Sequence, residues 1–325
     1  ILFSCSCLAN VLGLNISSAF NSAVTVYVMI PLLLIPQMIL SGLLFSFDKL
    51  NDILSTKGKV PIVADMMASR WAYEAMAVHH FQNNDFQSPY FDIQKTEAEA
   101  DFKAAYLVEE LKKKRRFITE NYEDANDSLK LIFAKDINII KSNLINEPFQ
   151  EGLEAVDIQN LSVDNFNKEV SGALEIYLGA YKKHYQNIYN KSVATRDKMV
   201  YFFENNEEYD YNLNELKNEY YNESLADLVM NVAEKDRIIE YKGELIQQIN
   251  PIYNEPKPDH LLDYRAQFFA PVKHFAGTYF STYFFNSIII WLMTALLYIA
   301  LYFEAVGKGI KALGKISFSS GKESK

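Results

Sequence analysis

The sequence predicts an all-α protein that combines three membrane-spanning helices with an α-helical domain outside the membrane. Two observations place the spans: neither residues 1–47 nor residues 275–303 contain Asp, Glu, Lys, Arg or His. A third predicts the extramembrane domain, because the long polar segment between these blocks repeats apolar residues at helical spacing. Since a spanning helix needs about 20 apolar residues, the first block holds two spans and the second holds one.

The three spans follow in order along the chain. The first is expected from residue 1 to about residue 14 and beyond. Residues 14–22 are expected to form a turn, because their Asn and Ser side chains can hydrogen-bond to the backbone locally. The second span is expected over about 24–47. The third is expected over about 284–303, where aromatic residues at both ends are typical of a membrane interface.

The residues after the third span predict the orientation of the chain. Residues 305–325 contain five Lys residues and one acidic residue, Glu323. Short Lys-rich segments beside a span remain on the cytoplasmic side of the membrane. We therefore expect a cytoplasmic C-terminal tail and an extracytoplasmic polar segment. The basic run at 112–116 does not oppose this orientation, since it lies far from any span.

The polar segment is expected to contain about four helices and no strands. Helices are predicted over 96–118 and 124–144, with Asp124 as the N-cap of the second. One apolar stripe steps by three or four residues through Phe166, Val170, Leu174, Tyr177, Tyr181, Tyr185 and Ile188. Its tyrosines are expected to pack their rings with the hydroxyls in water, and a tyrosine-rich binding face is the alternative.

A second apolar stripe predicts one more helix near the end of the polar segment. The prolines within 251–258 are expected to stop this helix. The stripe consists of Leu213, Leu216, Tyr220, Leu225, Leu228 and Val232.

The chain contains no motif of a catalytic or metal site. A phosphate-binding loop would need a hydroxyl residue where Ile316 follows Gly314 and Lys315. The five His residues lack the H-E-x-x-H spacing, and G-x-S-x-G does not occur. Cys5 and Cys7 are expected to pack as small side chains rather than to bind a metal. We therefore expect no catalytic residue, no metal and no cofactor in this chain, and no nucleic-acid partner.

Polar and helix-breaking residues interrupt the second span. Pro31 and Pro36 each remove a backbone donor and loosen the helix. Gln37 and Ser41 lie four residues apart and share one face, and Gly42 allows another helix to approach closely. The polar face favours the interior of a helix bundle or a substrate path. A helix kinked for packing alone is the alternative.

Two stretches of the sequence resemble a known family. The second span ends in "SGLLFSFDKLN" at 41–51, and "SRWAYEAM" follows at 69–76. With the order of the spans, they resemble the C-terminal half of the membrane domain of ATP-binding cassette exporters of the G subfamily, the white and sterol-exporter type. The resemblance covers 1–84 and, more loosely, 275–315. The polar segment is far larger than the usual loop of this family and is similar to the inserts of bacterial, Bacteroidota-like relatives.

The resemblance implies a domain plan. Residues 1–47 would be the fourth and fifth spans of a six-span domain, 48–84 a re-entrant outer-loop segment, and 85–274 an extracytoplasmic helical domain in the periplasm. Residues 275–304 would form the last span with its aromatic lead-in, and 305–325 the basic cytoplasmic tail. The protein would lie in a bacterial inner membrane.

The resemblance also implies the functional residues. Leu43 and Leu44 would form an apolar plug between an inner cavity and an outer exit. The substrate pathway below the plug would be lined by Met29, Leu33, Gln37, Leu40 and Ser41. The outer-loop motif would consist of Arg70, Trp71, Tyr73 and Glu74.

The function implied is that of the permease part of an ATP-driven exporter, which moves a hydrophobic or amphipathic substrate outward. It would work in the lipid bilayer as a homodimer or with a sister half. Because the first residue is Ile and not Met, we expect more protein upstream, where a nucleotide-binding domain would hold ATP and Mg. The alternative is a membrane-anchored sensor or scaffold whose helical outer domain binds a ligand or a partner.

Overall fold

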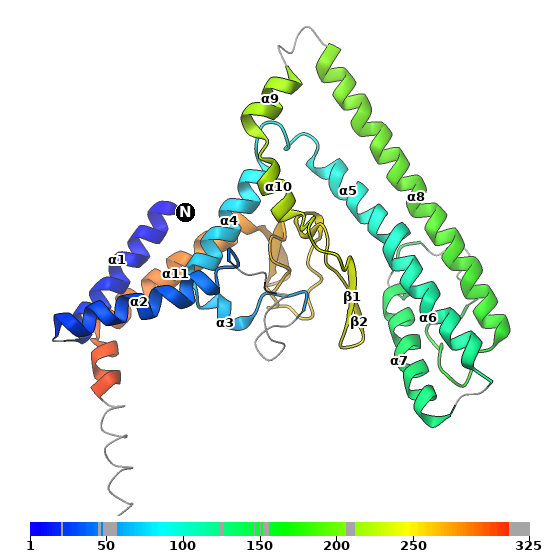
Figure 1. The fold of residues 1–325 in the computed structure, drawn as a ribbon, viewed down its shortest axis with the longest axis horizontal. Helices are drawn as coiled ribbons and strands as arrows, with labels where there is room; N and C mark the ends of the chain where they lie inside the picture. The colour runs from blue at the N-terminus through cyan, green and yellow to red at the C-terminus, as the bar shows by residue number, and fades with distance from the viewer. Residues whose placement is uncertain are drawn as a thin grey trace, which may run out of the picture. The chain divides into compact units, whose positions relative to one another are not determined.

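The computed structural model describes residues 1–20, 22–44, 47, 57–123, 126–145, 147–149, 151, 156–205 and 212–311. The chain divides into two compact units. Unit 1 consists of Ile1–His80 and Glu255–Lys325, and unit 2 consists of Phe81–Asn254. Helices make up most of the described residues (Figure 1). Residues 255–274, which were expected in the outer domain, belong to unit 1.

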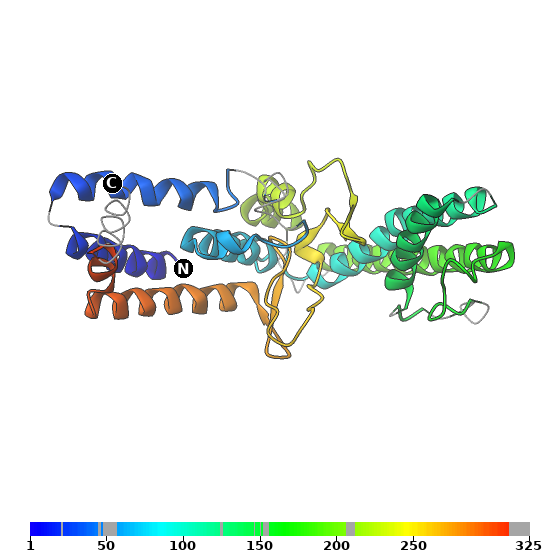
Figure 2. The ribbon, with the colours of Figure 1, turned by 90° about the horizontal axis from the view of Figure 1, so that it is seen from below.

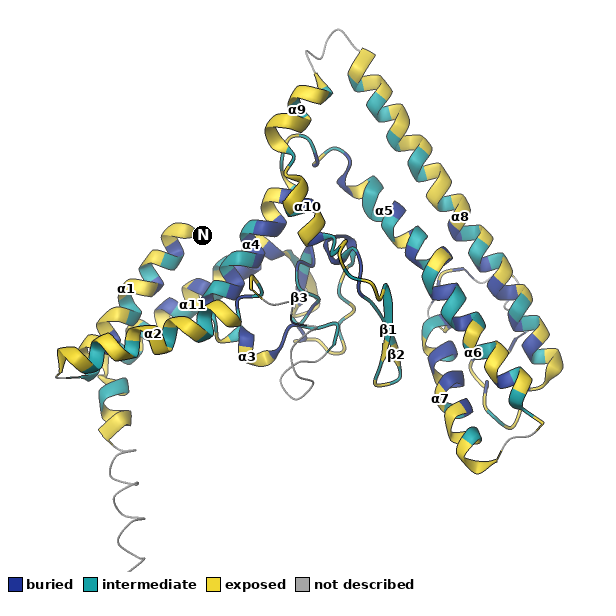
Figure 3. Cartoon of the chain, in the orientation of Figure 1, coloured by how far each residue is buried: buried dark blue, intermediate teal, exposed yellow. Residues whose placement is uncertain are grey.

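Two helices of unit 1 are long and apolar enough to cross a membrane. They are α1 (Leu2–Ala19) and α11 (Thr282–Tyr302), which lie side by side (Figure 2). A third apolar helix, α2 (Ala23–Ile39), has 17 residues and is shorter than a typical span of about 20. Much of the surface of these helices is exposed and apolar (Figure 3, yellow), as is typical of helices that face lipid. The length and composition of the described helices thus indicate a membrane protein with two candidate spans.

The turn predicted over 14–22 is wrong for most of its length. α1 continues to Ala19, and Asn15 is a buried residue of the helix. The side chain of Asn15 donates to the backbone oxygens of Val11 and Leu297, both at 2.9 Å. Since Leu297 belongs to α11, the amide nitrogen of this side chain bonds across a helix pair, and the residue does not end the helix.

The second apolar helix ends earlier than predicted. α2 stops at Ile39 and residues 40–44 leave the helix, so the expected end near residue 47 is wrong. Gly42 has a φ of 81°, which lies in the left-handed region that favours glycine. A Cβ atom at this position would lie 2.6 Å from the ring of Phe268. The chain therefore needs glycine here both for its conformation and for space.

Short elements complete unit 1. α3 (Ile62–Asp65) and α4 (Ala68–Gln82) follow α2 along the chain, although α4 ends just beyond the unit boundary. The antiparallel hairpin β3 (Val272–Phe275) and β4 (Thr278–Ser281) precedes α11, in a register that pairs its first residue with its last. The Oγ of Ser281 accepts from the backbone N–H of Phe284, so β4 leads directly into a capped helix.

Unit 2 is built on a bundle of helices. α5 (Phe91–Asp101), the π-helix η2 (Phe102–Leu107) and α6 (Val108–Asn121) follow one another without a break. α7 (Asp127–Leu144) packs on α6, and α8 (Lys168–Asn205) packs on α5 and α6. The helices predicted in these parts of the chain are confirmed, and the first begins earlier than expected.

The N-cap of α7 differs from the predicted one. The Oδ1 of Asn126 accepts from the backbone N–H of Leu129 at 2.9 Å. The predicted cap, Asp124, lies outside the described residues.

The predicted apolar stripe forms the buried face of α8 (Figure 3, dark blue). Leu174 and Tyr177 are fully buried against residues of α6 and α7. The tyrosine hydroxyls are not all in water as expected. Tyr177 donates to the backbone oxygen of Phe149 at 2.9 Å, and Tyr185 donates to the carboxylate of Glu147 at 3.0 Å. Tyr177 and Tyr185 are therefore core residues whose hydroxyls are hydrogen-bonded.

The single helix predicted from the second stripe is wrong. The chain forms two short helices there, α9 (Leu213–Tyr220) and α10 (Glu223–Val229). Asn222 separates them, because its Oδ1 accepts from the backbone N–H of Leu225 at 3.0 Å and so starts a new helix.

The prediction of no strands is also wrong, since the described residues contain two hairpins. β1 (Ile238–Tyr241) pairs with β2 (Glu244–Gln247) in unit 2, as β3 pairs with β4 in unit 1. Each hairpin is closed by two residues of positive φ, Lys242–Gly243 in one and Ala276–Gly277 in the other. This φ pattern is typical of the type I′ turn, which matches the twist of paired strands. The dipeptides K-G and A-G are the sequence signals that the helical interpretation missed.

Leu174→Ala is expected to destabilise unit 2 by about 2–5 kcal/mol, because it leaves a cavity in a packed core. Ile176→Ala is the matched control, since Ile176 is 74% exposed on the same helix and Leu174 is 0% exposed. Thermal unfolding of the detergent-solubilised chain, followed by circular dichroism, measures the difference. Equal melting temperatures for the two variants would contradict the core position of Leu174.

Candidate functional site

The predicted outer-loop motif forms the first two turns of α4. Its side chains Arg70, Trp71 and Glu74 are buried, and Tyr73 is half-buried. Arg70 and Glu74 lie four residues apart and therefore share one face of the helix. Two charges of opposite sign thus enter the interior of unit 1 together.

Glu74 connects three elements through its carboxylate. Its Oε1 accepts from Nζ of Lys273 in β3 at 2.6 Å. Its Oε2 accepts from Nδ2 of Asn286 in α11 at 2.9 Å and lies 3.4 Å from Nη1 of Arg70. The Asn286 amide also donates to the backbone oxygen of Trp71 at 3.0 Å. One carboxylate therefore ties α4 to the hairpin and to an apolar helix.

Arg70 also faces a second carboxylate. Its Nη2 lies 3.6 Å from Oδ1 of Asp65 in α3, and its guanidinium carbon lies 3.8 Å from the ring centroid of Trp71. The Trp71 indole donates to the backbone oxygen of Asp65 at 2.8 Å, and the Tyr264 hydroxyl donates to the Asp65 carboxylate at 2.9 Å. We call this set of two acids and two bases the buried charge cluster: Asp65, Arg70, Glu74 and Lys273.

The surroundings of the buried charge cluster keep Glu74 ionised. Burial opposes its charge, but the Lys273 and Arg70 cations and the hydrogen bonds from Lys273 and Asn286 hold the pKa of Glu74 below its usual value. Burial lowers the pKa of Lys273, and the Glu74 carboxylate opposes that shift. Because Glu74 and Lys273 are completely buried, they present no open group to a substrate. Their arrangement fits an internal clamp between elements.

The predicted plug residues lie on an exposed turn after α2. Leu43 is 62% exposed and Leu44 is 53% exposed. Ser41 shapes this turn, because its Oγ donates to the backbone oxygen of Met38 at 2.8 Å and accepts from the backbone N–H of Leu43 at 3.1 Å. We call residues 41–44 the leucine turn.

The predicted pathway residues lie along the partly covered side of α2 and its end. Met29, Leu33, Gln37 and Leu40 are half-buried, and Ser41 is buried. Most other residues of α2 are exposed, and none is fully buried. The pathway residues therefore share a face, as their spacing predicts.

Gln37 hydrogen-bonds to the start of α4. Its side-chain oxygen accepts from the backbone N–H of Ser69 at 3.2 Å and from its hydroxyl at 3.0 Å. The Ser69 hydroxyl lies 2.6 Å from the backbone oxygen of Gln37, to which it donates. A predicted pathway residue is thus attached to the first turn of the outer-loop motif.

Aromatic rings connect the motif to the leucine turn. The ring centroid of Tyr73 lies 6.1 Å from that of Phe268 and 5.9 Å from that of Phe269. Phe268 packs edge-on against Phe47, with 4.9 Å between centroids, and its ring leaves no room for a side chain at Gly42. The structure therefore brings the predicted motif and plug into one packed region.

Three residues of this region were not predicted from the sequence, namely Asp65, Lys273 and Asn286. A signal existed for two of them. Lys273 is a single charge within "PVKHF" at 271–275, immediately before an uncharged block, and Asn286 is the only amide side chain in 275–303. Isolated polar groups in apolar surroundings are commonly paired with one another when they are buried.

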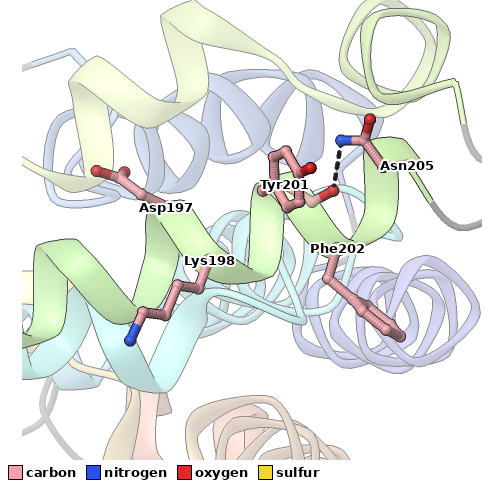
Figure 4. Close-up of a pocket in the computed structure, with 5 residues that line it drawn as sticks. All are labelled: Asp197, Lys198, Tyr201, Phe202 and Asn205. Carbon is pink, nitrogen blue, oxygen red and sulfur yellow. Dashed lines mark hydrogen bonds between the residues drawn. The ribbon is translucent and has the colours of Figure 1, made fainter.

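A hollow lies along the C-terminal part of α8 in unit 2. It has a volume of about 740 Å³ and is lined by five residues of this one helix: Asp197, Lys198, Tyr201, Phe202 and Asn205 (Figure 4). A single helix face does not enclose a ligand, so we assign no ligand to this hollow. Within the described ranges, no three His, Cys, Asp or Glu side chains gather in a way that would hold a metal ion.

Comparison of the chain with family models, curated proteins and solved structures finds no match. The family resemblance therefore rests on the two sequence stretches at 41–51 and 69–76 and on the predicted order of the spans.

Glu74→Gln is expected to destabilise unit 1 by about 3–5 kcal/mol, because it leaves the buried Lys273 ammonium without its partner. Glu74→Gln combined with Lys273→Met should recover most of this loss, since the unpaired charge is then gone. A double-mutant cycle from thermal unfolding in detergent measures the coupling. Purely additive effects would show that the two side chains do not act as a pair.

Proposed function

We propose that this chain is the permease part of an ATP-driven exporter of the ATP-binding cassette type. The observation that carries the proposal is the leucine turn, in which two adjacent leucines are exposed after a Pro-containing apolar helix. The turn needs Gly42 for its conformation and packs on the outer-loop motif region. An exposed apolar pair held in this way favours contact with another protein surface. In a dimer, the same pair of a second copy would meet it and close the path.

In this proposal α2 is the second of three spans in the chain, between α1 and α11. Its 17 residues extend over about 26 Å, and the apolar core of a bilayer is about 30 Å thick. The leucine turn would then lie near the outer edge of that core. The Lys-rich tail would be cytoplasmic, 48–84 would form a re-entrant outer segment, and unit 2 would lie in the periplasm of a bacterial cell.

The proposed substrate is hydrophobic or amphipathic and moves along the half-buried side of α2 toward the leucine turn. ATP and Mg would act on a nucleotide-binding domain upstream in the same protein. Hydrogen bonds between Gln37 and Ser69 link α2 to α4, and Glu74 links α4 to α11. A movement of one apolar helix would therefore be passed to the others as a displacement of packed elements.

A second candidate function is that of a membrane-anchored sensor or scaffold whose unit 2 binds a ligand. One observation favours it, namely an open cavity in unit 2 that is lined by both polar and aromatic residues. A protein of this kind would bind its ligand without hydrolysing ATP.

Replacing Leu43 and Leu44 together with Ala is expected to open the plug, because it removes the apolar groups that would close the path. In proteoliposomes of the full-length protein, the passive leak of carboxyfluorescein should rise severalfold. ATP hydrolysis should continue with less transport of the lipophilic dye rhodamine 6G per ATP.

Replacing Leu32 and Leu34 with Ala is the matched control for this experiment. Both are leucines of α2 with 59% and 54% exposure, close to that of the plug pair, and their loss should leave the leak unchanged. The same leak in both double variants would rule out the plug. A full-length protein that does not hydrolyse ATP would overturn the exporter proposal and favour the sensor.

A further inference from the structure

Unit 2 contains a cavity of about 350 Å³ that is separate from the leucine turn and the buried charge cluster. Its walls come from α5, α8, the end of α4 and the residues that follow it, the residues on either side of α10, and the 3-10 helix η4 (Pro251–Tyr253) with its N-cap. Segments far apart in the sequence thus line one space that is open to solvent, and its volume is that of a small-molecule site.

One face of α5 supplies the polar wall of this cavity. Gln94, Glu97 and Asp101 line it and are spaced by three and four residues, so they share a side of the helix. Arg196 and Tyr189 line it from α8 and lie seven residues, or about two turns, apart. The two helices therefore face each other across the cavity with charged groups between them.

Three of the uncharged polar groups satisfy one another. The Gln87 amide donates to the side-chain oxygen of Gln94 and to the hydroxyl of Tyr253, the latter at 3.2 Å. The Tyr253 hydroxyl donates to the same Gln94 oxygen at 2.6 Å. These groups form a closed hydrogen-bonded set, so they shape the wall without requiring a ligand.

The charged groups of the cavity are not balanced. The Glu97 side chain is nine-tenths buried; one of its oxygens accepts from Arg196 at 2.6 Å, and the other, Oε1, has no hydrogen-bond partner. Arg196 also lies 3.9 Å from the carboxylate of Asp197. Asp101 forms no ion pair with any residue that the structure describes. Two carboxylates thus line the cavity with one guanidinium, which leaves an excess negative charge.

Both carboxylates are charged at an energetic cost. Burial raises the pKa of Glu97, although the Arg196 cation opposes the shift. Burial also raises the pKa of Asp101. A cation that entered the cavity would lower this cost for both groups.

Aromatic rings form much of the remaining wall. Phe81, Tyr189, Tyr221 and Tyr253 line the cavity, and ring faces of this kind attract cations as well as apolar groups. The ring of Tyr221 already lies 5.8 Å from the ammonium of Lys217. The cavity therefore offers aromatic surface beside unbalanced carboxylates.

We propose that this cavity binds a small organic ammonium ion, with Glu97 and Asp101 as its counter-charges and the tyrosine rings as its apolar wall. An anion would meet an excess of negative charge, and its one possible cation, Arg196, is already paired. A divalent metal ion prefers several oxygen ligands in one shell, and the described residues hold no such group. The proposal is independent of transport, because the site needs neither ATP nor the leucine turn.

Isothermal titration calorimetry on the detergent-solubilised full chain tests the proposal with two probes, choline and phenethylammonium. At least one of them should bind saturably with one site per chain. The neutral isostere of choline, 3,3-dimethylbutan-1-ol, has the same shape without the charge. It should bind at least about tenfold more weakly, because it lacks the attraction between the ammonium charge and the carboxylates and rings.

Glu97→Gln and Asp101→Asn should each weaken ammonium binding by about tenfold. Their matched controls are Glu99→Gln and Asp92→Asn, which make the same changes at exposed positions of α5 and should leave binding unchanged. Arg196→Gln should instead tighten binding, because it removes the competing cation and frees the second oxygen of Glu97. Damage to the fold would weaken binding in all variants, so a gain in Arg196→Gln distinguishes a site from a structural contact.

Three results would overturn the proposal. One is the absence of saturable binding of both probes to the folded wild-type chain. Another is equal binding of choline and its neutral isostere. The third is weaker binding in Arg196→Gln, to the same degree as in the two carboxylate variants.

Discussion

Glu74 and Lys273 lie 2.6 Å apart in an interior where neither side chain reaches solvent. Charges in such a place are stable only when each has its partner, because removal from water costs several kcal/mol per ion. The pair comes from two chain segments separated by 199 residues. The second carboxylate oxygen of Glu74 accepts a hydrogen bond from Asn286 of α11. The neighbouring Arg70 forms an ion pair with Asp65 of α3. Four elements of unit 1 thus take their positions from one set of charges.

The leucine turn depends on this set indirectly. α2 has no fully buried residue, so packing along its length contributes little to its position within unit 1. Its defined contacts lie near its C-terminal end, at the Ser69 hydrogen bonds and at the Phe268 ring beside Gly42. Both contacts lead to α4 and its aromatic neighbours. A helix that is held at one end can tilt about that end, whereas α11 is held by the buried amide of Asn286.

Much of the fold follows from the sequence where its pattern is long. The uncharged blocks predict the apolar helices, and the apolar stripe, of which six regularly spaced residues lie in α8, predicts the buried face of that helix. Features that depend on one or two residues were not predicted. The dipeptides K-G and A-G close two hairpins, and Asn222 divides a segment that was predicted as one helix. The local pattern also places Asn15 in a turn, whereas its amide reaches the backbone oxygen of Leu297, near the other end of the chain.

The candidate site was predictable to a smaller extent. Arg70 and Glu74 were identified by resemblance, and their helical spacing explains why they enter the core together. Lys273 and Asn286 could not be joined to them from the sequence, because a distant pair of polar residues gives no local pattern. The cavity in unit 2 could not be predicted for the same reason, since α5 and α8 supply its charges from positions nearly one hundred residues apart.

Unit 2 interrupts unit 1 as a single insertion, the 174 residues from 81 to 254 inclusive. The entropy of closing a flexible loop rises only with the logarithm of its length, by about 0.6 kcal/mol per doubling. Growth from roughly 20 residues to this length is about three doublings, or about 2 kcal/mol. That is less than the roughly 3–5 kcal/mol that the loss of one partner from a buried ion pair costs. The insertion can therefore vary in length at a smaller cost to unit 1 than a single change that leaves one of its buried charges unpaired.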